Sequence, residues 1–174
     1  MNKKLKCFAI VLASVLIFAA IYMIVINHSR SAPEGSPNRT EAFVKMFDTI
    51  YHMYPEANSG TCTVVLQIKD WNEVDYKYAI NGITEYCSSK NMSLIVVPYG
   101  EDISNAELSN VNNVVIEFEA LRYHRRNPEN TKFTFNVKKY QPQATGYFIS
   151  AVCEWKIGSW ECYWVDARVI DTVD

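Results

Sequence analysis

The ten residues from Cys153 to Cys162 read CEWKIGSWEC, and their residue types recur in mirror order about the step from Ile157 to Gly158. If the chain folds back at that step as a β-hairpin, like residues face each other across two strands: Cys153 and Cys162, Glu154 and Glu161, and Trp155 and Trp160. Two cysteines directly opposite each other are within reach of a disulfide. The stretch therefore predicts a disulfide-bonded hairpin with two tryptophans on the same face.

When the same pairing is continued along both strands away from the turn, the two faces of the hairpin carry different residues. The tryptophan face carries Tyr147, Ile149, Ala151, Cys153 and Trp155 on one strand, and Trp160, Cys162, Trp164, Asp166 and Arg168 on the other. The second face is apolar at its base and charged at its tip, where Glu154 lies opposite Glu161. That pair needs water, Lys156 or another lysine between the two charges. We expect the helices of the protein to cover the base of the second face, around Val152, Tyr163 and Val165.

The turn itself leaves two alternatives open. A two-residue turn needs positive φ at both central residues, which suits Gly158 but not the β-branched Ile157. A four-residue loop from Lys156 to Ser159 keeps the same partners across the strands. The mirror order of residue types is compatible with both loops.

Residues 7–26, CFAIVLASVLIFAAIYMIVI, form an uncharged apolar run. At ~1.5 Å per residue, a helix of this length crosses the ~30 Å hydrocarbon core of a bilayer. Residues 1–6 hold three lysines and only Arg30 follows the run closely, so the positive-inside bias places the amino terminus in the cytoplasm. The run predicts a single-pass signal-anchor in the cell (inner) membrane. A cleaved signal peptide is the alternative, but its apolar region is usually shorter, at roughly 7 to 15 residues.

Either alternative sends the rest of the chain out of the cytoplasm, into the periplasm or the extracellular space. Residues 27–38 contain Pro33, Gly35 and Pro37 among small polar residues, which predicts a flexible stalk. Residues 39–174 are long enough for one domain with its own core. All 19 acidic residues but only 13 of the 17 basic residues follow residue 30, a formal net charge of −6. This balance argues against a nucleic-acid partner.

The chain beyond the stalk predicts an α+β domain. Apolar residues recur at helical spacing from Phe43 to Tyr54, with Thr40 as N-cap and Pro55 as the stop. A strand-helix-strand unit should follow, at about residues 61–69, 72–90 and 93–98, although Gly82 lies inside its helix. After a polar connection, four strands joined by short links predict an antiparallel meander: residues 113–123, 132–140, 146–156 and 159–169.

Four cysteines lie in the exported part, an even number in an oxidising compartment. Three pairings are formally possible. The strand from Cys62 advances ~23 Å and the helix that follows returns ~22 Å, which brings Cys87 back beside Cys62. We therefore predict the bridges Cys62–Cys87 and Cys153–Cys162.

The sequence contains no glycine-rich phosphate loop, no Cys-x-x-Cys pair and no zinc spacing of histidines, so it predicts no metal and no cofactor. Glu117 and Glu119 project from one strand face ~7 Å apart, a spacing that paired catalytic carboxylates use. A solvated sheet face produces the same pattern more often. Arg122, His124, Arg125 and Arg126 form a basic cluster at a hairpin end, which is either an anion or partner contact or an ordinary charged turn.

From the membrane anchor and the aromatic hairpin we expect a non-enzymatic interaction module. It would bind, stabilise or regulate another envelope protein. The candidate partner-binding residues are Trp155, Trp160 and Trp164, because tryptophan is enriched among interface anchors. Packing of these tryptophans inside the domain is the alternative for the residues themselves. For the function, the alternatives are a small-ligand or enzymatic cup, and an immunity or inhibitor protein against an exported toxin.

Overall fold

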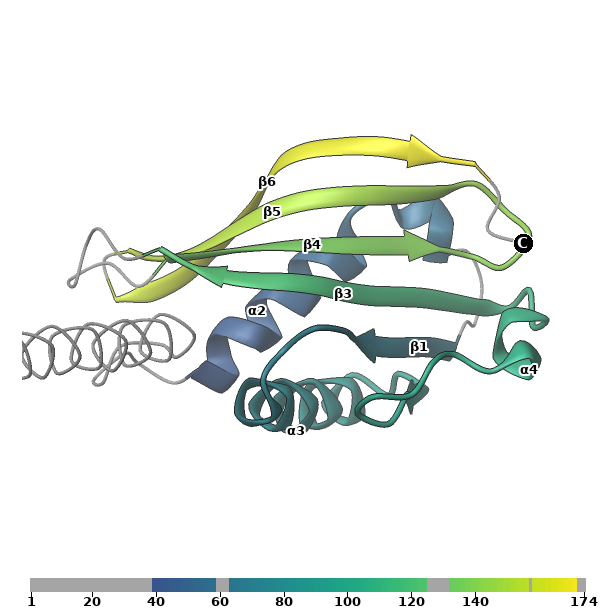
Figure 1. The fold of residues 1–174 in the computed structure, drawn as a ribbon, viewed down its shortest axis with the longest axis horizontal. Helices are drawn as coiled ribbons and strands as arrows, with labels where there is room; N and C mark the ends of the chain where they lie inside the picture. The colour runs from purple at the N-terminus through teal and green to yellow at the C-terminus, as the bar shows by residue number, and fades with distance from the viewer. Residues whose placement is uncertain (1–38, 59–62, 125–131, 157, 172–174) are drawn as a thin grey trace, which may run out of the picture.

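The structure, a computed structural model, describes residues 39–171 except 59–62, 125–131 and 157 (Figure 1). The predicted cytoplasmic tail, anchor and stalk (residues 1–6, 7–26 and 27–38) lie outside these residues. Within the described part of the chain, no helix has the length and apolar character needed to cross a membrane.

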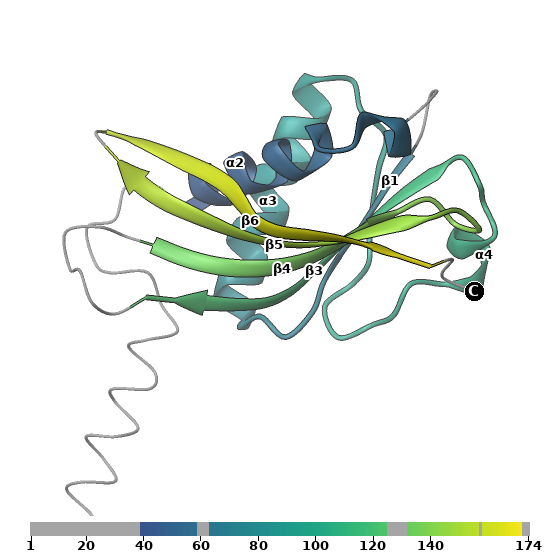
Figure 2. The ribbon, with the colours of Figure 1, turned by 90° about the horizontal axis from the view of Figure 1, so that it is seen from above.

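An α+β domain is formed, in which two long helices lie on one face of a mixed six-stranded sheet (Figures 1 and 2). In chain order its elements are α2 (Arg39–His52), η1 (Pro55–Asn58), β1 (Thr63–Ile68), α3 (Glu73–Ser89), β2 (Leu94–Val96), α4 (Asn105–Leu108), β3 (Asn113–Tyr123), β4 (Lys132–Tyr140), β5 (Gly146–Lys156) and β6 (Ser159–Ile170). The predicted strand-helix-strand unit and antiparallel meander are both present.

The two predicted units share one sheet, with the strand order β2-β1-β3-β4-β5-β6. β1 pairs in parallel with β2 on one side and with β3 on the other, whereas β3 to β6 pair in antiparallel fashion. The parallel pairing of β1 with β3 extends from Thr63 opposite Asn113 to Ile68 opposite Phe118. Parallel strands need a long connection, and residues 69–112 with α3, β2 and α4 supply it.

The apolar stripe of α2 faces the sheet as its spacing predicts. The helix begins at Arg39, so Thr40 lies inside it and the predicted N-cap is wrong. It ends at His52, and Pro55 begins the short helix η1. The fully buried residues of α2 are Ala42, Phe43, Met46, Phe47 and Ile50.

Gly82 permits the close packing of α2 on α3. A Cβ atom at Gly82 would lie 2.3 Å from Cγ2 of Thr40 and 2.9 Å from Cγ2 of Val44. Glycine in a helix costs about 1 kcal/mol relative to alanine, but here its missing side chain is the space that α2 occupies. The same contact explains why Thr40 is a packing residue of α2.

Lys139 of β4 caps the carboxyl end of α2 from inside the core. Its side chain is fully buried, and its ammonium donates hydrogen bonds to the backbone carbonyls of Tyr51 (2.7 Å), Met53 and Tyr54 (3.4 Å). The last carbonyls of a helix have no partner within the helix. A cation is also favoured there by the helix dipole, so the buried charge has a structural role.

The helices cover the tryptophan face of the hairpin, so our prediction that they cover Val152, Tyr163 and Val165 is wrong. The reason lies in the pairing of β4 with β5. Its apolar residues Phe133, Phe135 and Val137 pair with Cys153, Ala151 and Ile149, whereas its polar residues Thr134, Asn136 and Lys138 pair with Val152, Ser150 and Phe148. A helix layer buries the face on which neighbouring strands are both apolar.

A β-bulge interrupts the predicted register of the hairpin. Pairing follows the mirror from Lys156 and Ser159 as far as Ala151 and Trp164, and then Ser150 pairs with Asp166. Val165 is therefore an extra residue in β6. Beyond it, Asp166 and Arg168 lie on the open face of the sheet, not on the tryptophan face as expected.

In the part of the chain that the structure describes, helix and loop segments cover the open face of the sheet only at one end. There α4 and its flanking loops add Ile103 and Leu108 to a small buried cluster of Val65, Val97, Val115 and Tyr140. The sequence signal for α4 was the capping box of Ser104 and Glu107, in which both reciprocal hydrogen bonds form. The predicted polar connection before β3 therefore contains a short helix.

Candidate functional site

The structure separates the three candidate tryptophans. Trp160 is only 4% exposed and packs against Phe133, with ring centroids 5.7 Å apart. Trp155 contacts Trp160 edge to face at 5.6 Å and is partly buried against the same core. Trp164 is 57% exposed. Trp155 and Trp160 are therefore packing residues. Of the three tryptophans, only Trp164 is exposed enough to contact a partner.

The predicted hairpin bridge is present, with the sulfur atoms of Cys153 and Cys162 2.02 Å apart. Cys87 is buried and has no disulfide partner among the described residues, so the second predicted bridge stays a prediction. Its predicted partner, Cys62, lies outside the described residues. The length argument does return the end of α3 to the start of β1, where the Val64 amide donates to the Ser93 carbonyl at 2.9 Å. The lengths of the strand and the helix predict how far along the sheet Cys87 lies, but not which residues it packs against. Its side chain belongs to the core cluster.

β6 has four large hydrophobic side chains that are exposed. Tyr163 donates a hydrogen bond from its hydroxyl to Glu154 at the hairpin tip, and we call the other three the β6 strip: Trp164, Val165 and Val169. Val165 is 66% exposed and Val169 is 62% exposed. β6 is an edge strand, and no described strand pairs with its outer side (Figure 1). Such an edge leaves backbone N–H and C=O groups available to another chain. The strip therefore combines free backbone hydrogen-bonding groups with apolar side chains.

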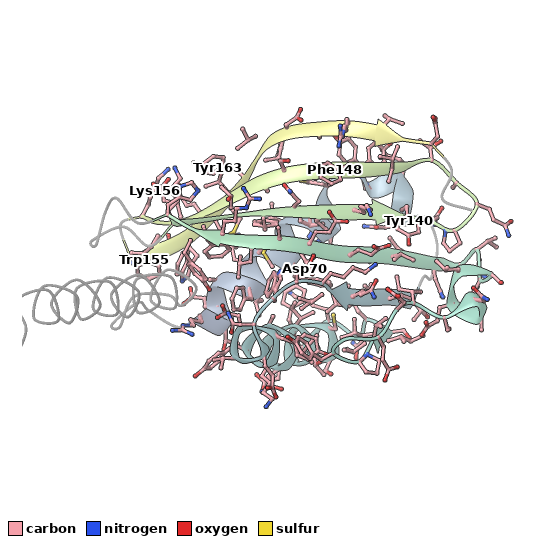
Figure 3. All side chains as sticks on the ribbon, in the orientation of Figure 1. Asp70, Tyr140, Phe148, Trp155, Lys156 and Tyr163 are labelled. Atoms are coloured by element: carbon pink, nitrogen blue, oxygen red, sulfur yellow. A yellow bond between two sulfur atoms is a disulfide. The ribbon has the colours of Figure 1, made fainter. Side chains whose placement is uncertain are left out.

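Charged residues at the hairpin tip are paired with one another. Lys156 bonds to Glu154 at 3.0 Å and lies 3.7 Å from Glu161, so it separates the two carboxylates that the mirror register places opposite each other. The hydrogen bond from Lys156 lowers the pKa of Glu154, and the same bond raises the pKa of Lys156. Trp155, Lys156 and Tyr163 all lie at this end of the sheet (Figure 3). Lys132 also lies 3.8 Å from Glu154, so two lysines balance the two carboxylates of the tip.

The predicted carboxylate pair does not form a shared site. Glu117 is buried, accepts a hydrogen bond from the Tyr140 hydroxyl at 2.5 Å and lies 3.3 Å from the Lys69 ammonium. Glu119 is paired with Lys138 at 2.8 Å. Each carboxylate therefore has its own cation. We attribute both to the polar ladder of the open face.

The predicted basic cluster is only partly visible. Arg122 and His124 are exposed at the end of β3, and Arg125 and Arg126 lie outside the described residues. His52, the other histidine of the domain, has its Nδ1 2.8 Å from the Asp48 carbonyl of its own helix. Among the described residues, no group of three or more His, Cys, Asp or Glu side chains is arranged to hold a metal ion.

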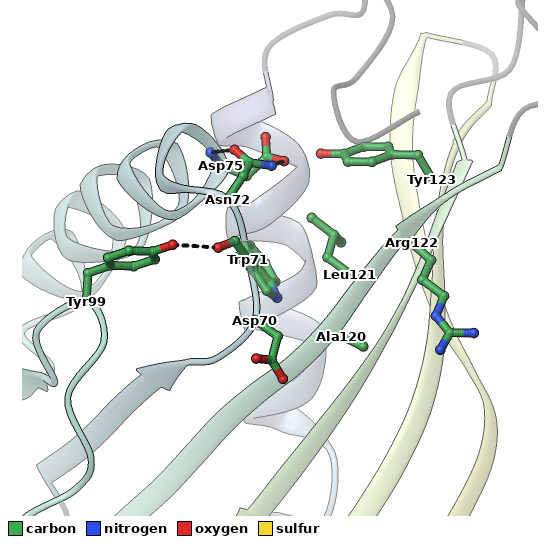
Figure 4. A pocket seen from close by; sticks show the side chains of 9 residues that line it. All are labelled: Asp70, Trp71, Asn72, Asp75, Tyr99, Ala120, Leu121, Arg122 and Tyr123. Carbon is green, nitrogen blue, oxygen red and sulfur yellow. Dashed lines mark hydrogen bonds between the residues drawn. The ribbon is translucent and has the colours of Figure 1, made fainter. Parts of the chain in front are cut away.

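A crevice of about 580 Å³ opens beyond the carboxyl end of β1 (Figure 4). β1 lies at a switch point of the sheet, because α3 packs on one face and the α4 connection crosses the other. Ligands of open α/β sheets bind at this kind of position. The lining residues are Asp70, Trp71, Asn72, Asp75, Tyr99, Ala120, Leu121, Arg122 and Tyr123.

The inner end of the crevice contains a buried carboxylate. Asp75 accepts hydrogen bonds from the Asn72 side chain at 2.6 Å and from Arg39 at 3.4 Å. Burial raises the pKa of Asp75, and contacts with Asn72, Tyr123 and Arg39 oppose the shift. The buried Tyr123 hydroxyl points toward the Asp75 carboxylate but makes no hydrogen bond of normal geometry with a described residue (Figure 4). Burial, followed by the charge of Asp75, raises the pKa of Tyr123.

Sequence reasoning did not find this crevice. Its residues come from β3, from the loop after β2 and from the β1–α3 junction, and they meet only because β1 and β3 are parallel neighbours. The available signal was the polar segment Asp70, Trp71 and Asn72, which directly follows a buried strand. The same segment also provides Asn72, the N-cap of α3.

Comparisons with known proteins do not assign the chain to a family. No protein-family model matches it, and no curated protein matches it. Among solved structures, an S-adenosylmethionine-dependent methyltransferase from Clostridium acetobutylicum ATCC 824 aligns over 92% of this chain and 82% of its own, with 7% identity and a TM-score of 0.19. A likeness at that level supports no conclusion about fold or function.

Proposed function

We propose that this protein is a membrane-anchored, non-enzymatic interaction module whose domain lies outside the cytoplasm. Residues 7–26 are the anchor, and the domain binds an envelope polypeptide through the β6 strip. The observation that supports this proposal is the presence, on one strand, of an edge that no described strand pairs with and of the three exposed apolar side chains of the β6 strip. The binding residue retained from the sequence is Trp164.

Strand addition is the mode of binding that this surface suits. An extended segment that pairs with a free edge gains main-chain hydrogen bonds, and its side chains meet those of the strand it joins. Exposed apolar side chains of this size mark interaction sites when they are grouped. A tryptophan within the group is the type of residue on which binding energy concentrates.

Two features favour binding over catalysis. Glu117 and Glu119 are held by different lysines and do not line the crevice. The β6 strip is also rigidly supported, because the disulfide of Cys162 and the buried ring of Trp160 fix the first half of the same strand. A rigid surface loses less entropy on binding.

Site-specific photo-crosslinking of the full-length chain in its own membranes tests the proposal. A photoreactive residue at Trp164 or Val169 should form a covalent adduct with a polypeptide upon irradiation. The matched control is Tyr78, which is 46% exposed on α3, away from β6. No adduct from either β6 position, or equal adducts from Tyr78, would refute binding through the strip. Mass spectrometry of the adduct identifies the partner.

The crevice favours a second candidate function, the binding of a small ligand. The specific observation is the Tyr123 hydroxyl, which is buried beside the Asp75 carboxylate without a hydrogen bond of normal geometry to any described residue. A ligand group that hydrogen-bonds to this hydroxyl would satisfy it. Native mass spectrometry of the purified protein should then show a retained small molecule that is lost in Ala120→Trp, which fills the crevice. Identical spectra of the two proteins would remove this candidate.

A further inference from the structure

We propose that the partner of the β6 strip is a second copy of this chain, with the two β6 edges pairing in antiparallel fashion about a two-fold axis at Ala167. This inference rests on the proposed function, since it names the partner of the same surface. It starts from the segment Asp166–Ile170, which lies beyond the β-bulge and pairs regularly with β5. Most soluble homo-oligomers have closed symmetry of this kind, with the same patch on both subunits.

The charges of β6 are self-complementary in this register. With Ala167 opposite Ala167 of the other copy, Asp166 of each chain lies opposite Arg168 of the other, which gives two cross-strand ion pairs. An axis at Asp166 or at Arg168 would instead place a like charge against itself. Opposite charges across strands stabilise and like charges destabilise. Both residues are exposed in the single chain.

The apolar side chains match in the same register. Val165 of each copy lies opposite Val169 of the other. Ala167 packs toward the core under the helices, and alternation along the regular segment after the bulge places Val169 on that face. The two-fold pairing brings Val165 of each copy beside Val169 of the other. Four exposed valines would lose contact with water together.

The geometry also suits two chains attached to one membrane. The two-fold axis between antiparallel edge strands is perpendicular to the sheet, so the joined sheets keep the same face on the same side. α2 lies on that face in each copy, and each domain begins at Arg39, the first residue of α2. Both anchors, proposed at residues 7–26, would therefore approach from the same side of the dimer.

Cysteine crosslinking in membranes containing the full-length chain tests the symmetry directly. In Ala167→Cys, the new thiol lies opposite its own copy and should form a covalent dimer under mild oxidation. In Val169→Cys, the two thiols are four residues apart along the strands, or ~13 Å, and should not crosslink. The wild-type chain controls for its own cysteines. Absence of an Ala167→Cys dimer, or equal dimer from Val169→Cys, would overturn the proposal.

A charge swap provides a second, independent measurement in the Ala167→Cys background. Asp166→Arg places arginine against Arg168 twice and should reduce the dimer yield by about tenfold. Adding Arg168→Asp restores opposite charges in the same positions and should restore the yield. Failure of this rescue would contradict the register. If photo-crosslinking at Trp164 captures a different protein while Ala167→Cys stays monomeric, the dimer is wrong and the proposed function stands.

Discussion

Replacing Trp160 by alanine measures how much of the hairpin belongs to the core. The side chain is almost completely buried and contacts the rings of Phe133 and Trp155. A buried tryptophan removes ~150–250 Å² from water, worth ~4–6 kcal/mol at ~25 cal/mol per Å². Observed costs of such substitutions are ~3–5 kcal/mol. We expect the free energy of unfolding to fall by about 4 kcal/mol.

Urea unfolding of the purified domain, followed by far-ultraviolet circular dichroism, measures this change. With a slope of ~2 kcal/mol per M, the midpoint of Trp160→Ala should fall by about 2 M. The matched variant is Trp164→Ala, which removes the same side chain from a site that buries less than half of it. That midpoint should fall by less than about 1 M. Equal midpoints for the two variants would refute the assignment of Trp160 to the core and Trp164 to the surface.

Three further predictions concern buried polar groups and the disulfide. Lys139→Met should lower the free energy of unfolding by about 2–4 kcal/mol, because the last carbonyls of α2 lose a charged donor; urea unfolding measures it. Burial raises the pKa of Asp75 above its ordinary 3.8, so its stabilising contribution is full below pH 3.8 and declines as pH rises through the folded-state pKa. Asp75→Asn should flatten that part of the stability–pH curve. Replacing Cys153 and Cys162 by alanine should cost about 2–3 kcal/mol, as expected for a loop of this length, measured by thermal unfolding.

Each of these has a control within the chain. Lys138→Met removes the neighbouring, half-exposed lysine, whose pair with Glu119 lies on the open face, and should cost less than about 1 kcal/mol. If Lys138→Met and Lys139→Met destabilise equally, the helix-capping role is wrong. A stability–pH curve that is unchanged in Asp75→Asn contradicts the raised pKa. Addition of a reducing agent to the double alanine variant should have no effect on its stability.

The hairpin register was predictable because it depends on neighbours in sequence. Cys153, Trp155, Trp160 and Cys162 pair as their mirror order requires, and a strand register follows from the residue types that meet across a turn. The bulge at Val165 was not predictable in this way, since nothing in the alternation of β6 marks an extra residue. The bulge places Asp166 and Arg168 on the open face, whereas an uninterrupted register would place them on the tryptophan face.

The face of the hairpin under the helices depended on a strand that precedes the hairpin. Phe133, Phe135 and Val137 of β4 align with the tryptophan face, and α2 and α3 bury that side. Trp160 became a core residue for this reason. Trp164 shares its strand but lies on the edge, where nothing else in the described chain covers it.

By itself, the sequence determined the α+β class, the order of the elements, the Cys153–Cys162 hairpin and the apolar stripe of each long helix. These properties depend on local periodicity and on residues close in the chain. Tertiary structure alone decided that β1 and β3 are parallel neighbours, which creates the crevice at Asp75. It also decided that β6 is an open edge, which leaves Trp164 exposed. Both depend on which distant strands lie side by side, and that choice is made by burial of the whole sheet rather than by any one segment.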